Sequence, residues 1–112
     1  MPAYVIARVD ISNPEQYATY TARTPRVVAD FGGRFIVRTG DVLTVEGPAE
    51  TRRVVVIEFP SLEQAKAFYA SEAYGAVKAR RARAADGQFI IVDGYPEAAW
   101  EAAVATSRAV TD

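Results

Sequence analysis

Four short, largely apolar segments of the chain are predicted to be β-strands, and along the first of them the residues alternate with the period of two that is typical of a strand. The predicted strands cover residues 3–10, 34–39, 53–59 and 89–93. A turn or bulge at Gly40 and Asp41 follows the second strand, and we expect extended chain again over residues 42–46. The third strand is the most apolar of the four, and Pro60 ends it.

The segment between the first two predicted strands carries apolar residues at helical spacing. Asn13 is the expected N-cap of this helix, and Pro14 suits the first helical position. Because Pro25 lacks a backbone donor, we expect the helix to kink or restart there, with Thr24 as a second cap. The glycine pair at 32–33 then ends the helix.

Two further helical patterns follow the third and fourth strands. Ser61 is the expected cap of the first, and Ser71 is expected to cap a second segment that runs from residue 72 to about residue 85. The last pattern begins after Pro96 and places Trp100 and Val104 one turn apart.

The predicted order of elements is strand, helix, strand, strand, helix, strand, which is the ferredoxin-like βαββαβ pattern of an α+β domain. This fold has a four-stranded antiparallel sheet with helices on one face. We therefore predict a ferredoxin-like domain over residues 1–95 and a C-terminal helical extension over residues 96–112.

Both faces of the predicted sheet are apolar. In the third strand Val55, Ile57 and Phe59 share one face, and Val54 and Val56 share the other. Sheets that are covered on both sides show this pattern. Helices cover one face, so we expect a second copy of the chain to cover the other in a homodimer, since most soluble assemblies are symmetric. The alternative is a monomer whose C-terminal helix folds back under the sheet.

The composition narrows the possible chemistry. The chain has no Cys and no His, which removes thiol and imidazole catalysis, disulfides and the usual ligands of zinc, copper and haem. The sequence shows no acidic cluster of the kind that holds Mg²⁺ or Ca²⁺, so we expect a metal-independent protein without a cofactor. With 13 basic and 14 acidic residues, the chain lacks the basic excess of a nucleic-acid-binding protein.

The chain also carries no apolar run long enough to span a membrane, so we expect no membrane partner. Its first residues predict a strand rather than a signal sequence. We therefore expect a cytoplasmic location.

Charged residues near the ends of the strands form the candidate site. We expect the first and third strands to run parallel and adjacent, which would bring Arg8, Glu58 and Arg34 together at one end of the sheet. A carboxylate held between guanidinium groups stays ionised, which makes Glu58 the candidate catalytic base. The arginines, with Arg38 on the same side, are candidate ligands for an anionic molecule. The alternative is an ion pair that fixes the register of a dimer and binds nothing.

Side chains on the helices supply further candidates. Tyr20 and Tyr69 either line a ligand pocket between helix and sheet or lie in the core with their hydroxyl groups bonded. The basic run at residues 78–83 is either a solvated helix face or a means of attracting anions to a nearby pocket.

Several of these segments together resemble a family of small bacterial proteins called the domain of unknown function 1330 family. The likeness spans position 3 to about position 94 and rests on Tyr17 and Tyr20, GGRFIVR at 32–38, VVVIEFPS at 54–61, the run of Ala65, Phe68, Tyr69, Ser71 and Tyr74, and Arg80 and Arg81. The resemblance implies membership of the dimeric α+β barrel superfamily, in which two ferredoxin-like sheets face each other. The chain departs from the family at Ala49, where relatives commonly carry a Trp, and in the helix after Pro96.

The sequence leaves three classes of function open for this protein. That superfamily includes small-molecule oxygenases, isomerases, dehalogenases and ligand-sensing domains, so a shared fold does not fix the function. The protein is a cofactor-independent enzyme that uses Glu58, a Tyr and the Arg group on a small anionic or carbonyl-bearing molecule, or a module that binds such a molecule without turnover. The third class is a purely structural dimer with fully paired charges and no cavity.

Overall fold

Four strands form a single sheet in the order β2-β3-β1-β4, and each pair of neighbouring strands is antiparallel. The computed structural model of the protein describes residues 1–38 and 40–111. Its strands are β1 (Ala3–Ile11), β2 (Arg34–Val37), β3 (Arg53–Phe59) and β4 (Ala85–Asp93). The element order and the sheet order confirm the predicted ferredoxin-like α+β fold.

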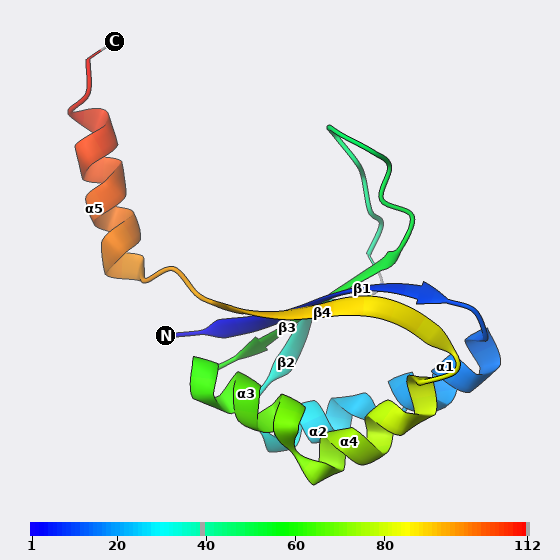
Figure 1. Cartoon of the computed structure of the whole chain (residues 1–112). Helices are drawn as coiled ribbons and strands as arrows, with labels where there is room; N and C mark the ends of the chain where they lie inside the picture. Colours follow the sequence, from blue (N-terminus) through cyan, green and yellow to red (C-terminus); the bar gives the residue numbers. More distant parts are fainter. Residues whose placement is uncertain (39, 112) are drawn as a thin grey trace.

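The helices between the strands pack on one face of the sheet (Figure 1). They are α1 (Pro14–Thr21), α2 (Thr24–Asp30), α3 (Leu62–Ala70) and α4 (Glu72–Lys78), which is followed by a 3₁₀ turn at Ala79–Arg81. We call the covered side of the sheet the inner face and the opposite side the open face. Helix α5 (Glu97–Arg108) and the loop 40–52 both project on the side of the open face (Figure 1). Within the described ranges, no helix combines the length and the apolar character needed to cross a membrane.

Side-chain caps begin three of the helices, as the sequence predicts. Asn13, Ser61 and Ser71 each accept a hydrogen bond from the backbone N–H three residues later, at 3.2, 3.2 and 3.0 Å. The predicted restart at Pro25 is present and separates α1 from α2. Thr24 is not the cap of α2, because it is the first helical residue and its hydroxyl group bonds back to a carbonyl of α1.

Three element boundaries differ from the prediction. Residues 42–46 form no strand and belong to the loop after β2. The helical segment expected to reach about residue 85 ends at Lys78, and β4 begins at Ala85 rather than Phe89 because its pairing with β1 extends that far. The predicted second strand also included residue 39, which lies outside the described residues.

The glycine pair after α2 allows the chain to turn tightly against β3. Gly32 has a φ of 79°, and Gly33 N donates to Val28 O at 2.9 Å, which is the arrangement of a Schellman motif. A Cβ atom on Gly33 would lie 2.5 Å from the ring of Phe59. The absence of a side chain at this position therefore lets the end of α2 approach β3.

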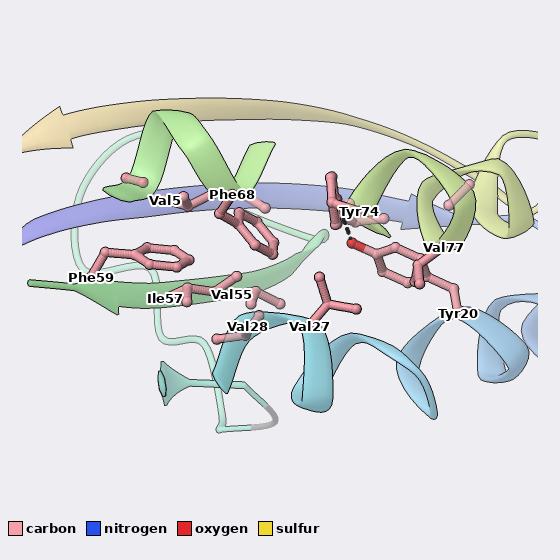
Figure 2. Close-up of a cluster of buried hydrophobic side chains, with 14 of the residues drawn as sticks. Val5, Tyr20, Val27, Val28, Val55, Ile57, Phe59, Phe68, Tyr74 and Val77 are labelled. Carbon is pink, nitrogen blue, oxygen red and sulfur yellow. Dashed lines mark hydrogen bonds between the residues drawn. The ribbon is translucent and has the colours of Figure 1, made fainter. Parts of the chain in front are cut away.

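The hydrophobic core lies between the inner face and the helices (Figure 2). The buried residues of the two central strands alternate along them and are Ala3, Val5, Ala7, Val9, Val55, Ile57 and Phe59. The ring of Phe68 lies 4.9 Å from that of Phe59 and 4.5 Å from that of Tyr74. The predicted division of β1 and β3 into two faces is confirmed.

The open face is apolar, and no helix or strand of the described residues covers it. Val56 and Ile6 are half-buried by their strand neighbours, and Ile90 and Val92 are 39% and 41% exposed. Helix α5 has no buried residue and projects away from the sheet (Figure 1). The structure therefore does not show the alternative in which the C-terminal helix folds back under the sheet.

Candidate functional site

Arg8 and Glu58 lie on the same face of the sheet but near opposite ends of it. Because β1 and β3 are antiparallel, Glu58 pairs with Tyr4 while Arg8 pairs with Val54. The two positions are therefore separated by roughly 13 Å along the strands. The expectation that the first and third strands run parallel is wrong. In the split βαβ motif a strand of the other unit lies between the two parallel strands and opposes both.

Glu58 is left with Arg34 as its ion-pair partner. Arg34 Nε lies 3.3 Å from Glu58 Oε1, and the two side chains are 73% and 29% exposed. A pair this open to solvent contributes little to stability. The predicted contact between Arg34 and Glu58 is confirmed, whereas the three-residue group with Arg8 does not form. A catalytic role for Glu58 stays a prediction that the geometry does not support.

Arg8 belongs instead to an ion-pair group at the base of the loop 40–52. Arg8 Nε lies 3.2 Å from Glu50 Oε1, and Arg52 Nε donates to Glu50 Oε2 at 3.0 Å. Hydrogen bonds from Arg52 hold the pKa of Glu50 below its ordinary value, and the same contact raises the pKa of Arg52. Glu50 N also donates to Thr44 Oγ1 at 2.9 Å. This group fixes the loop against β1.

Arg38 points toward the inner face, not to the side of Arg34. A register shift between Phe35 and Val37 breaks the alternation on which the prediction relied. Arg38 Nη2 donates to Thr21 O at 2.7 Å, and its guanidinium group lies 4.5 Å from the centre of the Phe35 ring. The side chain thus connects the end of β2 to the end of α1.

A small cavity, here called the inner pocket, lies between α1, α2 and the inner face. Its volume is about 20 Å³, which is enough for one water molecule. Its lining includes Val5, Val55, Ile57 and Phe68 on the apolar side and Tyr17, Tyr20, Tyr74, Thr21, Thr24, Arg38 and Arg53 on the polar side. The structure therefore brings together two of the predicted ligand-binding residues, Tyr20 and Arg38.

Two arginines near the inner pocket have incomplete hydrogen bonding. The Nε atoms of Arg53 and Arg81 are buried and have no hydrogen-bond partner among the described residues. Neither forms a salt bridge within that part of the chain. Arg53 lies 5.8 Å from the centre of the Tyr17 ring, and Arg81 lies 4.1 Å from that of Phe89. Buried hydrogen-bond donors in proteins are nearly always satisfied. A further polar group that accepts a hydrogen bond would therefore be favourable beside each of these two Nε atoms.

The sequence carried a signal for Arg53 that the prediction missed. Arg53 has the same strand parity as Val55 and Ile57, so a charged side chain occupies an inner-face position of an apolar strand. Arg81 gave no comparable signal. It lies in the basic run 78–83, whose other basic members are exposed, and is itself half-buried.

The hydroxyl groups of Tyr20 and Tyr74 form a buried pair beside these arginines (Figure 2). Burial raises the pKa of Tyr20 and the neighbouring Tyr74 raises it further, while Arg81 acts in the opposite direction. Burial also raises the pKa of Tyr17. For Arg81, burial lowers the pKa, but the hydroxyl groups of Tyr74 and Tyr20 outweigh this and raise it. At neutral pH, Tyr20 is therefore protonated and Arg81 is charged.

Tyr69 does not line the inner pocket. Its ring packs 5.3 Å from that of Tyr74 and 6.4 Å from that of Phe89, and Lys78 Nζ lies 4.8 Å from its centre. The structure therefore places Tyr69 at the edge of the core, where its ring covers Tyr74.

The inner pocket combines positive charge, neutral hydroxyl groups and an apolar wall. Its lining residues include no carboxylate, and the chain has no His to act as a base. Guanidinium groups in such surroundings suit a carboxylate or a carbonyl oxygen, because charge-assisted hydrogen bonds are stronger than neutral ones. Within residues 1–38 and 40–111, no three His, Cys, Asp or Glu side chains are grouped closely enough to hold a metal ion.

A family comparison covers most of the chain. Residues 2–95 match the model of a family described as a domain of unknown function (DUF1330). The chain belongs to the DUF1330 family. The resemblance predicted from the sequence motifs is confirmed, and helix α5 of this DUF1330 chain lies beyond the matched residues. No curated protein matches the sequence.

Solved structures similar to this DUF1330 chain share its fold. A protein of unknown function from Rhodopseudomonas palustris, RPA0582, is 21% identical with a TM-score of 0.68, over 85% of this chain and 83% of that one. SnoaB, a cofactor-independent oxygenase from Streptomyces nogalater, is 11% identical with a TM-score of 0.56, over 85% and 94%. A dimeric ferredoxin-like protein of unknown function from Thermobifida fusca is 16% identical with a TM-score of 0.58, over 84% and 92%. Identities this low establish the ferredoxin-like fold alone.

Proposed function

We propose that this protein is a homodimer that binds a small molecule with an anionic or carbonyl group in the inner pocket, without chemical turnover. The observation that carries the proposal is the pair of buried Nε donors on Arg53 and Arg81 that the described chain leaves without partners. Arg53 lines the inner pocket, so a carboxylate there, with about four acceptor sites, can satisfy its donor, whereas a carbonyl oxygen offers two acceptor sites.

The size of the inner pocket implies that a ligand larger than water must displace a side chain. Arg38 is the residue placed to move, because it is half-buried at the polar side of the pocket. One hydrogen bond to Thr21 O and the contact with Phe35 hold it there. An anionic ligand competes well for this guanidinium group, since a charged acceptor binds it more strongly than a neutral carbonyl. The apolar wall then receives the hydrocarbon part of the ligand.

The residues in and around the inner pocket favour binding without turnover over catalysis. The raised pKa of Tyr20 keeps its hydroxyl group protonated, so it donates a hydrogen bond and does not act as a base. Glu58, the predicted base, lies on the open face with Arg34. An enzymatic function is supported only by analogy, because SnoaB, which has a similar fold, is described as a cofactor-independent oxygenase. A purely structural role is disfavoured because Arg53 and Arg81 have no salt-bridge partner among the described residues.

The homodimer is proposed through the open face. Leaving Val56, Ile6 and their apolar neighbours in water costs about 25 cal/mol for each Å² of apolar surface. A second copy presents the same apolar surface and can cover this one in a symmetric contact. The similar protein from Thermobifida fusca, described as dimeric, supports this assembly by analogy.

The ligand proposal is tested with thermal unfolding in the presence of acetate, benzoate and 2-oxobutyrate, each compared with its neutral amide. At one hundred times the dissociation constant a ligand stabilises the folded state by about 2.7 kcal/mol. We expect at least one carboxylate, and not its amide, to raise the melting temperature. NMR spectra of the ligand should stay unchanged after prolonged incubation.

Arg52 and Arg53 provide a matched pair of variants for the same experiment, since Arg52 pairs with Glu50 away from the pocket. Arg53→Met should abolish the shift caused by the carboxylate, whereas Arg52→Met should keep it. Equal shifts in both variants, or no shift with any carboxylate, would overturn the ligand proposal. Chemical change of the ligand that requires Arg53 would favour the enzyme class instead.

A further inference from the structure

Helix α5 carries an apolar stripe that its own subunit leaves uncovered. Trp100, Ala103, Val104 and Ser107 follow one another at spacings of three, one and three residues, which places them on one side of the helix. Trp100 is 59% exposed, and no residue of α5 is buried. A stripe of this kind is typical of a helix that packs against another element.

The same helix is short and has no side-chain N-cap, although Glu97 in its first turn and Arg108 in its last turn suit the helix dipole. It is 12 residues long, and isolated helices shorter than about 12–15 residues are marginal in water. Its N-cap residue is Pro96, which supplies no side-chain hydrogen bond. The alanines between Trp100 and Arg108 favour helix formation, but they bury nothing. A packing partner is therefore needed for a stable α5.

The connection to β4 directs α5 away from its own sheet. Gly94 N donates to Pro2 O at 2.8 Å, which ties the end of β4 to the start of β1. The contact is close, because a Cβ atom on Gly94 would lie 2.3 Å from that oxygen. Only Tyr95 and Pro96 then separate this fixed point from the helix. The short connection holds α5 on the side of the open face (Figure 1).

Helix α5 projects on the side of the open face, which is the side on which the proposed second copy binds (Figure 1). The open face of the sheet has a small area. Four strands about 4.8 Å apart and about seven residues long cover a flat area of roughly 450 Å². A standard interface removes about 800 Å² of accessible surface from each partner. Contacts made by α5 would add to an interface that the sheet alone supplies only in part.

We infer that α5 is an arm that packs the stripe of Trp100 and Val104 against the partner copy. Each subunit of the dimer is then held by the helix of the other as well as by the sheet. The inference rests on the proposed homodimer and extends it to residues 97–108, which lie beyond the part of the chain matched by the family model. The dimer can form without the arm, so the two ideas can fail separately.

Trp100 is the single Trp of the chain and reports directly on this contact. We expect its fluorescence emission to be blue-shifted in concentrated, dimeric samples and to shift to the red on dilution, together with dissociation measured by analytical ultracentrifugation. A dimer whose Trp100 emits as a fully exposed indole would overturn the arm while leaving the dimer. Emission that stays blue-shifted after the dimer has dissociated into monomers means that α5 packs on its own subunit, which also overturns it. A monomer at all concentrations overturns both ideas.

Adjacent positions on α5 supply matched variants. Val104 belongs to the stripe, whereas Ala105 lies on the other side of the helix and is exposed. We expect Val104→Glu to weaken the dimer about tenfold or more and Ala105→Glu to change it less than about twofold. Equal effects of the two substitutions on the dissociation constant would contradict the inference. Circular dichroism of both variants checks that the ferredoxin-like body stays folded.

Discussion

The hydroxyl oxygens of Tyr20 and Tyr74 lie 2.7 Å apart in the core, which joins α1 to α4 across 54 positions of sequence (Figure 2). Both side chains are buried, and their rings meet edge to face with centroids 6.4 Å apart. This contact holds the two helical segments together beside the inner pocket. It also brings together two of the hydroxyl groups that line the inner pocket.

Removing either hydroxyl group should destabilise the protein. Tyr20→Phe and Tyr74→Phe each leave one buried hydroxyl group without its partner, at an expected cost of about 1–3 kcal/mol. The double variant should cost less than the sum of the two, because it leaves no unsatisfied hydroxyl group. Urea unfolding of the four proteins measures this coupling. Additive effects would show that the two hydroxyl groups do not depend on each other.

Stability should fall at alkaline pH because of Tyr20. Burial raises the pKa of Tyr20 above its ordinary value of 10.0, so the folded protein holds this proton more tightly than the unfolded chain. The contribution is therefore complete below pH 10 and is lost as the pH rises through the higher pKa of the folded state. The free energy of unfolding, measured from pH 8 to pH 11.5, should fall more steeply above pH 10 in the wild type than in Tyr20→Phe. If the free energy of unfolding fell equally steeply in both proteins above pH 10, Tyr20 would not be the cause of the loss.

Two glycines should respond in opposite ways to replacement by alanine. Gly33→Ala places a methyl group 2.5 Å from the buried ring of Phe59, so we expect a loss of about 1–3 kcal/mol. Gly75 lies inside α4 with open space where a side chain would begin. Gly75→Ala should therefore stabilise the protein by about 0.5–1 kcal/mol through helix propensity. Thermal unfolding of the two variants under one set of conditions tests both signs.

Glu58→Gln should have little effect on folding. Arg34 is largely exposed, and pairs of this kind contribute under about 1 kcal/mol. Any ligand binding by the inner pocket should also survive, since Glu58 lies on the open face of the sheet. Loss of more than about 3 kcal/mol would instead indicate a buried charge network in the assembled protein.

Val56→Asp should produce monomers or insoluble protein, because it places a charge at the centre of the proposed interface. Light scattering of the purified protein measures the mass of the assembly. Ala67→Asp on the exposed side of α3 is the matched control, and it should leave the assembly unchanged. A wild type that is monomeric over a wide range of concentrations would contradict the open-face dimer.

The alternation of residues predicted which side chains share a face of the sheet. It could not predict which of them lie at the same end of the sheet. Alternation places Arg8, Arg34 and Glu58 on the open face, because the period of a strand decides which side a residue takes. Which residues share an end depends on strand direction, a property of the whole topology. The prediction assigned that direction wrongly for β1 and β3, and so it joined Arg8 to Glu58.

The predicted face of the Arg38 side chain was wrong for a different reason. The register shift between Phe35 and Val37 turns the following side chain to the other face, and a bulge of this kind leaves no trace in the alternation of a strand of four residues. Tyr20 repeats at helical spacing with Tyr17, and the structure places it in the core, where it also lines the inner pocket. The unsatisfied donors of Arg53 and Arg81 depend on the folded surroundings of each side chain and become visible only in three dimensions.

The sheet order has a consequence for synthesis of the protein. Of the four strands, β1 is synthesised first and occupies a central place in the sheet, whereas its partners β3 (Arg53–Phe59) and β4 (Ala85–Asp93) are synthesised later. Ala3 pairs with Phe59 on one side and with Asp93 on the other. The N-terminal strand therefore waits for nearly the whole domain before its backbone is paired, and such long-range pairing slows folding. A ribosome that stalls before residue 85 holds a chain whose β1 has one unpaired edge, which is a substrate for chaperones.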